Sequence, residues 1–157
     1  MPPMKMAKTL ADRLIRSRKT LAIAESCTGG FIGHTLTNIP GASTWFKGGV
    51  IAYADQAKID ILGVPEAIIR EHGAVSAPTA RAMAAGARRR FKSDLAIATT
   101  GIAGPTGGTP EKPVGLVFIG LATTRGTSVK KYIFKGSRLQ IKKQTLNAVL
   151  SIARFKK

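Results

Sequence analysis

The spacing of hydrophobic and polar residues changes from segment to segment along this chain of 157 residues. Apolar residues spaced three and four positions apart predict amphipathic helices, and short continuous apolar runs bounded by Gly, Pro or polar residues predict buried strands. These patterns predict helices at 4–18, 31–37, 55–62 and 65–71, a helix that begins at Ser76 or Ala77, and a last helix that Ser137 caps. They predict strands at 20–24, 48–54, 94–99, 114–123 and 127–134.

The order of these elements indicates the fold class. Strands alternate with helices over the first hundred residues, and the turn Arg125–Gly126 then joins the last two strands into an antiparallel hairpin. We therefore expect a three-layer α/β/α sandwich with a mixed, mostly parallel sheet and a C-terminal β-hairpin followed by a helix. The length fits a single domain over residues 1–157.

The chain is strongly basic, with 25 Lys and Arg against 8 Asp and Glu, a formal net charge of +17. A nucleic-acid partner, a small anionic substrate or merely a basic solvated surface would each fit this charge. Aromatic residues make up only 6% of the chain and do not interleave with the basic clusters, so we do not expect nucleic acid as the main partner. No apolar stretch reaches the roughly 18–20 residues that span a membrane.

Cysteine and histidine usage narrows the chemistry further. Cys27 is the only cysteine, which excludes an internal disulfide, and residues 1–8 lack an apolar signal core, so we expect a cytoplasmic location. The two histidines, His34 and His72, lie far apart in the sequence and form no metal-ligand pattern. We expect neither a metal nor another cofactor.

Polar, glycine-rich segments follow or flank three predicted strands, at 25–30, 41–58 and 99–108. Open α/β sheets bind ligands at the carboxyl ends of their strands. If the three strands are parallel, Ser26, Tyr53 and Thr100 lie on one rim of the sheet, and the three loops build one site.

Two of these loops are suited to ligand binding. The first leads into a helix, whose free N–H groups favour an anion near Thr28, Gly29 and Gly30, although Ser26 or Thr28 could instead be an ordinary helix cap. In the third loop, Gly101 and Gly104 would allow the backbone to approach a ligand closely, although the loop could also be a flexible surface segment.

Lys58 is a candidate general base. Burial would lower the pKa of its amine, and so would the N-terminal turn of a helix capped by Asp55. A neutral Lys58 could take the proton of a serine hydroxyl, whereas a solvated surface lysine could not. Ser43 precedes Lys58 by fifteen positions, and the strand and two turns between them could fold Ser43 back onto it.

Taken together, these segments resemble the CinA C-terminal domain family. The resemblance runs in order from about residue 7 to about residue 153. Its motifs are AESCTGG at 24–30, PGAS at 40–43, WFKGGVIAYADQAK at 45–58, LGV at 62–64, HGAVS at 72–76, TGIAGPTGG at 100–108 and KPVG at 112–115. Full-length relatives carry a further N-terminal domain similar to molybdopterin-binding proteins, so the resemblance implies the stand-alone form here.

Stand-alone members of the PncC type act as nicotinamide-nucleotide amidases. The resemblance therefore implies hydrolysis of nicotinamide mononucleotide to nicotinate mononucleotide and ammonia by a metal-free Ser/Lys mechanism. By position it implies Ser43 as the nucleophile and Lys58 as its base, with Ser26 as the alternative nucleophile. It further implies Tyr53 and Thr100 as site residues and Arg138 as an arginine near the substrate, although Ser137 stands where an acid is expected.

Two other functions fit the same sequence. A nucleotide-binding module without catalysis would use the same glycine-rich loops, and it would bind nucleotides without releasing ammonia. A nucleic-acid-associated protein, connected with competence or DNA damage as the family's older naming suggests, would bind with an affinity that falls steeply with salt. We also expect self-association into a homo-oligomer, which is common for α/β domains of this size.

Overall fold

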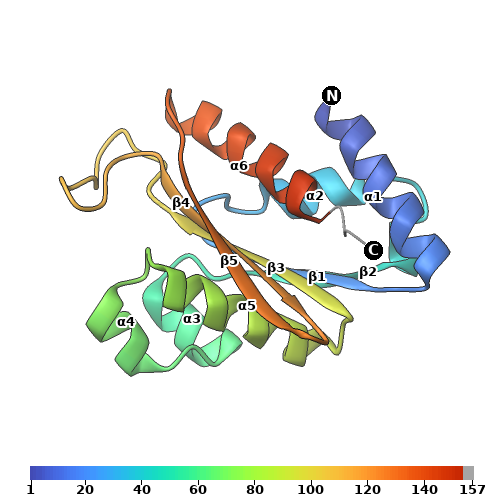
Figure 1. Ribbon diagram of the computed structural model, residues 1–157, viewed down its shortest axis with the longest axis horizontal. Coiled ribbons are helices and arrows are strands. Elements are labelled where there is room, and N and C mark those ends of the chain that lie inside the picture. Colours follow the sequence, from blue (N-terminus) through green and yellow to red (C-terminus); the bar gives the residue numbers. More distant parts are fainter. Residues whose placement is uncertain (154–157) are drawn as a thin grey trace.

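A five-stranded sheet separates two layers of helices in the computed structural model, which describes residues 1–153 (Figure 1). The strands are β1 (Leu21–Glu25), β2 (Phe46–Ile51), β3 (Leu95–Gly101), β4 (Leu116–Thr123) and β5 (Gly126–Ile133). One face is covered by α1 (Pro3–Ser17), α2 (Phe31–Thr37) and α6 (Arg138–Ile152), and the other by α3 (Asp55–Leu62), α4 (Glu66–His72) and α5 (Ala77–Phe91). The three-layer α/β/α prediction is confirmed.

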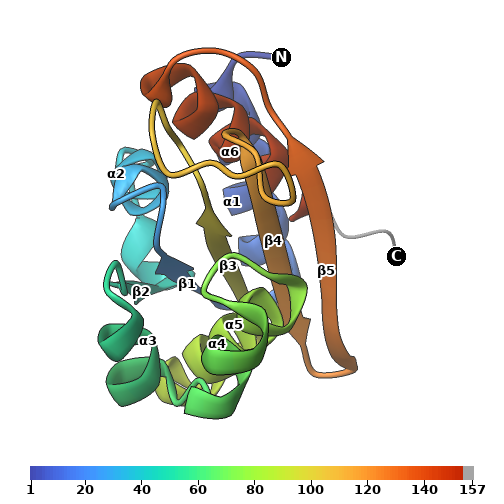
Figure 2. The same ribbon diagram turned by 90° about the vertical axis from the view of Figure 1, so that its left-hand side faces the viewer.

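The sheet has the order β2-β1-β3-β4-β5. β1 pairs in parallel with β2 on one side and β3 on the other, whereas β4 is antiparallel to both β3 and β5. The carboxyl ends of β1, β2 and β3 therefore lie at one edge of the sheet. Figure 2 views the molecule from that side, with the loop at 102–115 crossing above α4.

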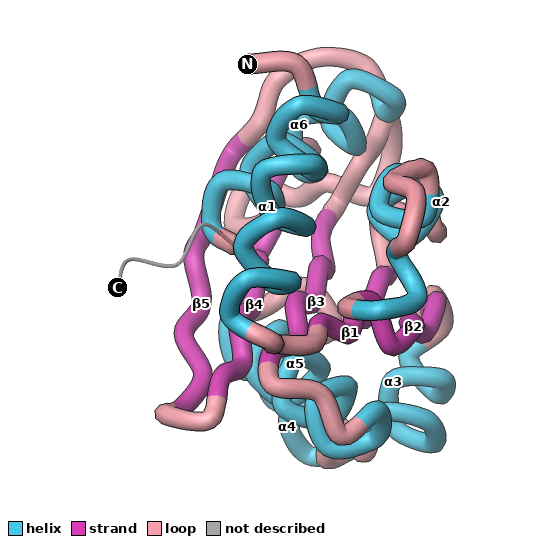
Figure 3. The backbone as a smooth tube through the Cα atoms, turned by 90° about the vertical axis from the view of Figure 1, so that its right-hand side faces the viewer, coloured by secondary structure: helices cyan, strands magenta, loops and turns pink. Residues whose placement is uncertain are grey.

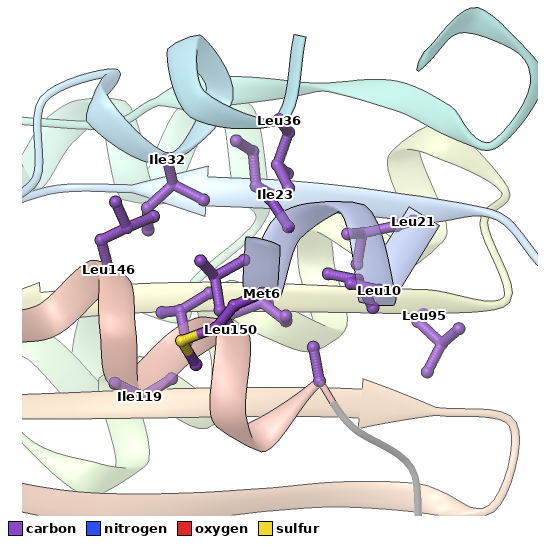
Figure 4. Close-up of a cluster of buried hydrophobic side chains, with 14 of the residues drawn as sticks. Met6, Leu10, Leu21, Ile23, Ile32, Leu36, Leu95, Ile119, Leu146 and Leu150 are labelled. Carbon is purple, nitrogen blue, oxygen red and sulfur yellow. The ribbon is translucent and has the colours of Figure 1, made fainter. Parts of the chain in front are cut away.

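The two faces of the sheet are packed differently. Large aliphatic side chains of α1, α2 and α6 fill the first interface, among them Leu10, Ile32 and Leu150 (Figure 4). The second interface is built mainly from alanines: Ala22, Ala24, Ala96, Ala98 and Ala122 of the sheet, facing Ala84 and Ala87 of α5. Small side chains bring α5 close to the sheet, as the alanine-rich sequence of this helix predicts.

Within residues 1–153, no helix combines the length and the apolar character needed to cross a membrane. The boundaries of most elements differ from the predicted ones by one or two residues. The largest difference for the site concerns the second strand, which ends at Ile51 and not at Ala54. Tyr53 therefore follows β2 in a short connection to α3 and does not end the strand.

The close approach of α3 to α5 depends on Gly86. A side chain at this position would overlap the carbonyl oxygen of Leu62, the last residue of α3. α3 carries Lys58 four residues earlier, so this contact helps to fix the helix that holds the candidate base.

We expect Gly86→Ala to destabilise the protein by about 1–3 kcal/mol, because backbone atoms cannot make room as a flexible side chain can. Helix propensity alone predicts the opposite sign, since alanine is the better helix former. Urea unfolding would measure the difference, with Ala85→Gly as a control that changes propensity by about 1 kcal/mol. An increase in stability for Gly86→Ala would show that α3 and α5 are not packed this closely.

Candidate functional site

A cavity of about 250 Å³ lies at the carboxyl edge of β1 and β3. It brings together residues from the loops after β1, β2 and β3, from the segment before α5, and from the start of α6. Of the residues predicted from the sequence, those that line it are Ser26, Tyr53, Lys58, Thr100, Gly101, Gly104 and Arg138. The expectation that three loops after parallel strands share one rim agrees with this geometry.

Ser26 is held at the edge of the sheet with its hydroxyl unused. Its backbone N–H donates to the Thr99 carbonyl at 3.0 Å, and its own carbonyl accepts from the Gly29 N–H at 3.0 Å. The residue is only 8% exposed. Its hydroxyl forms no hydrogen bond within residues 1–153, so it is available to a ligand in the cavity.

A buried carboxylate occupies the start of α2. Glu25 is 1% exposed, and its oxygens accept hydrogen bonds from the N–H groups of Gly30, Ile32 and Gly33 at 3.1, 3.1 and 2.8 Å. These are N–H groups that a helix leaves without partners in its first turn. The sequence predicted that these N–H groups would bind either an external anion or the side chain of Ser26 or Thr28. In the structure the Glu25 carboxylate accepts them instead.

Consequently, the predicted substrate-binding residues of this turn lie outside the cavity. Thr28, Gly29 and Gly30 are not among its lining residues. The Thr28 hydroxyl is fully buried and shares a hydrogen bond of 2.9 Å with the Thr99 hydroxyl, which ties the turn to β3. Thr28 therefore supports the loop from below the cavity lining.

Lys58 is a buried amine, only 1% exposed. Its Nζ donates to the Tyr53 carbonyl at 3.0 Å and lies 3.9 Å from an oxygen of Asp55. Burial lowers the pKa of Lys58 below its usual value, while the negative charge of Asp55 opposes that shift. Burial thus shifts the pKa in the predicted direction, and the charge of Asp55 acts against it. Asp55 is the first residue of α3 and does not cap the helix, because Ala54 occupies the cap position.

Arg138 connects three segments at the mouth of the cavity. Its guanidinium donates to the Tyr53 hydroxyl at 2.6 Å and to the Gly104 carbonyl at 2.7 Å. Ser137 caps α6 in a capping box, in which its N–H donates to the Gln140 side chain at 2.7 Å. The serine that replaces the expected acid thus fixes the helix end from which Arg138 extends.

Thr100 and the glycines that follow it shape the wall of the cavity. The Thr100 hydroxyl donates to the Ala74 carbonyl at 2.7 Å, so its oxygen can still accept a hydrogen bond but its proton is committed. A Cβ on Gly101 would lie 2.7 Å from the Leu116 carbonyl oxygen, and a side chain at Gly104 would overlap the segment before β4. These glycines are needed for packing within the chain, in addition to any contact with a ligand.

The structure does not bring Ser43 to Lys58, which corrects the predicted pair. Ser43 is exposed in a short 3-10 helix, Ala42–Thr44, that precedes β2, whereas Lys58 follows β2. Because β2 runs parallel to β1, the two residues lie at opposite edges of the sheet. Ser43 does not line the cavity, and Trp45 is buried in the core beside it.

Several residues that line the cavity were not singled out from the sequence. Ala74 and Val75 line it from the connection between α4 and α5, and their signal was the motif HGAVS at 72–76. Cys27 lines it next to Ser26. Burial is the main cause that raises the pKa of the Cys27 thiol to about 12, so this cysteine stays protonated at neutral pH and is a poor nucleophile.

Potential metal ligands are not clustered in this site. Among residues 1–153, no group of three or more His, Cys, Asp or Glu side chains is arranged to hold a metal ion. The polar groups that the cavity offers are instead a free serine hydroxyl, a buried amine, an arginine and backbone N–H groups. Such groups can support acyl transfer through a serine nucleophile.

The sequence matches known proteins over nearly its whole length. The family model described as "CinA C-terminal domain" matches residues 3–156. The chain is 51% identical over 143 residues to a putative competence-damage inducible protein of Caldicellulosiruptor bescii, covering 91% of this chain and 35% of that protein. It is 53% identical over 142 residues to a CinA-like protein of Syntrophus aciditrophicus, covering 90% and 34%. The chain thus spans about a third of the length of these curated relatives.

Solved structures share the fold. The competence/damage inducible protein CihA from Agrobacterium tumefaciens is 37% identical, with a TM-score of 0.90 over 96% of this chain and 92% of that one. A competence-damaged protein (CinA) superfamily member from Klebsiella pneumoniae is 27% identical, with a TM-score of 0.94 over 98% and 96%. Sequence and structure agree, and this chain belongs to the CinA C-terminal domain family.

Proposed function

We propose that this protein hydrolyses the carboxamide of nicotinamide mononucleotide to nicotinate mononucleotide and ammonia, with Ser26 as the nucleophile and Lys58 as its base. The observation that carries the proposal is that a serine hydroxyl without a partner and a buried lysine with a lowered pKa line the same cavity. The substrate is taken from the resemblance to nicotinamide-nucleotide amidases. The free, buried thiol of Cys27 is consistent with a cytoplasmic location.

In the first step, neutral Lys58 accepts the proton of the Ser26 hydroxyl as the oxygen attacks the carboxamide carbon. The carbonyl oxygen then becomes an oxyanion that needs hydrogen-bond donors. The backbone N–H of Ala103 is suited to this role, because Ala103 lines the cavity and its N–H is not bonded within residues 1–153. Loss of one such donor typically costs about 100- to 1000-fold in rate.

The second half of the reaction returns the lysine to its starting state. Protonated Lys58 gives its proton to the leaving nitrogen, which departs as ammonia, and Ser26 is left as an acyl ester. Water, deprotonated by the same amine, attacks the ester and releases the carboxylate product with the proton returned to Ser26. Lys58 begins and ends each half-reaction neutral, which requires the low pKa that its burial provides.

We expect Ser26→Ala and Lys58→Met each to lower ammonia release by at least about 1000-fold, as removal of either member of a nucleophile–base pair does. Ser43→Ala is the matched control and should retain wild-type turnover, because Ser43 lies at the opposite edge of the sheet. Ammonia release from nicotinamide mononucleotide with EDTA present would measure all three, and circular dichroism would verify folding. Loss of activity in Ser43→Ala, with Ser26→Ala active, would reverse the assignment.

The pH profile provides a second test. Only the neutral amine can accept a proton, so kcat/KM should rise with pH through the pKa of Lys58, at a pH below the ordinary value of 10.5. Asp55→Asn removes the carboxylate that raises this pKa, so it should move the rising limb to lower pH. Asp60→Asn, a change on the same helix at a residue bonded to Gln56, should leave the limb in place. A limb that moves to higher pH in Asp55→Asn would exclude Lys58 as its source.

A second candidate function is association with nucleic acid. Exposed basic side chains favour it at the opposite edge of the sheet, where the amino ends of β1, β2 and β3 lie. The α1–β1, α5–β3 and β4–β5 connections meet there, and hydrogen bonds from Thr20 to Asp94 at 2.8 and 2.9 Å join the first two (Figure 3). This edge carries exposed basic side chains: Arg16, Arg18, Lys19, Arg89, Arg90, Lys92 and Arg125. The cavity lies at the other edge, so both functions could coexist.

If this basic edge binds nucleic acid, duplex DNA should bind with an affinity that falls as salt rises. The double variant Arg89→Glu, Arg90→Glu should weaken that binding and leave amide hydrolysis unchanged. Fluorescence anisotropy of labelled duplex at 50 and 200 mM salt would measure the effect, with Lys5→Glu, Lys8→Glu on α1 as a charge-matched control. Equal loss in both double variants would show that net charge, and not this edge, is responsible.

A further inference from the structure

Lys142 is a cation beside the cavity that the reaction described above does not use. It lies four residues after Arg138 on α6, so the two side chains extend from the same face of the helix. A Cβ built on Gly29 would lie 3.7 Å from the Lys142 Nζ, which places the ammonium against the loop that carries Ser26. The positive charge of Lys142 also reaches Cys27, where it lowers the pKa of the thiol slightly against the larger effect of burial.

No group among the described residues pairs with this ammonium. Lys142 is half-buried, and within residues 1–153 it forms neither a hydrogen bond nor an ion pair. Glu25, an acid of the neighbouring loop, already accepts three backbone N–H bonds. The ammonium is therefore free to pair with an anion that binds here, and a charge-assisted hydrogen bond would form.

We propose that Lys142 and Arg138 together form a subsite for the phosphate monoester of the substrate, and that Lys142 selects phosphorylated amides over uncharged ones. The inference rests on the proposed amidase function, whose substrate carries an amide at one end and a phosphate at the other. A phosphate monoester carries close to two negative charges at neutral pH, which two cations can neutralise. Arg138 would contribute a planar fork with N–H groups beyond the two already used, and Lys142 a compact charge.

The turn from Ser26 to Gly29 fits a substrate that carries an amide at one end and a phosphate at the other. Gly29 follows Ser26 by three residues, and the hydrogen bond from its N–H to the Ser26 carbonyl closes the segment into a turn. The two Cα atoms are therefore within about 7 Å of each other. The reacting carboxamide at Ser26 and the phosphate near Lys142 would thus lie at the two ends of one mononucleotide.

The next residue, Lys143, provides a matched control. It has the same charge and belongs to the same helix, but its side chain extends about 100° further around the helix axis. Lys143 is exposed, whereas Lys142 is half-buried. A comparison of the two alanine variants therefore separates the position of the charge from its presence.

The test compares kcat/KM for nicotinamide mononucleotide and for its dephosphorylated nucleoside in the two variants. Lys142→Ala should lower kcat/KM for the mononucleotide by about 10- to 100-fold, mainly through KM, as expected for a lost hydrogen bond to a charged group. It should leave the nucleoside within about twofold. Lys143→Ala should leave both substrates unchanged, and Lys142→Arg should restore most of the discrimination.

Equal losses for both substrates in Lys142→Ala, or no loss for either, would overturn the subsite. If the wild-type protein hydrolyses neither substrate, the amidase function itself fails. A binding measurement then still tests the phosphate subsite. Isothermal titration with nicotinate mononucleotide should then give a Kd at least about tenfold weaker in Lys142→Ala than in Lys143→Ala. Identical affinities in the two variants would overturn the subsite independently of catalysis.

Discussion

The parallel pairing of β1 with β2 and β3 is the constraint on which the site depends. Strands that run in one direction end at one edge, so the loops that carry Ser26, Lys58 and Thr100 meet although they are far apart in the sequence. Ser43 lies at the opposite edge from Lys58, because one precedes β2 and the other follows it. The direction of β2, parallel to β1, places Lys58 at the edge that carries Ser26.

Within that edge, Glu25 determines how the protein can recognise an anion. Its buried carboxylate satisfies three N–H groups at the start of α2 and fixes the turn that holds Ser26. A helix end that is already neutralised in this way cannot also attract a ligand anion. In the proposed subsite, recognition of negative charge comes instead from the cationic side chains of α6.

The fold could be predicted from the sequence because each layer has a strong local pattern, with apolar runs for strands and three-to-four spacing for helices. The rim of Ser26, Tyr53 and Thr100 could be predicted as well, because it needs only strand order and direction. The contacts of Glu25 and Arg138 could not. Glu25 is the last residue of a strand, whereas a helix-capping side chain is expected in the turn that follows. The contact of Arg138 with Tyr53 joins residues that are 85 positions apart. The end of β2 was predicted too late because the apolar run continues past Ile51 through Ala52, Tyr53 and Ala54.

In the proposed mechanism, Lys58 must meet two conflicting requirements, and its surroundings contribute to both. A base must be neutral before the reaction, and burial provides this by disfavouring the ammonium. After it accepts the serine proton, however, the same ammonium must exist for long enough to protonate the leaving nitrogen. The Tyr53 carbonyl at 3.0 Å and the Asp55 carboxylate at 3.9 Å stabilise that charged form without cancelling the effect of burial. Because Asp55 is exposed to solvent, its attraction is screened, so desolvation remains the larger effect on the pKa of Lys58, in the direction that the proposed base requires.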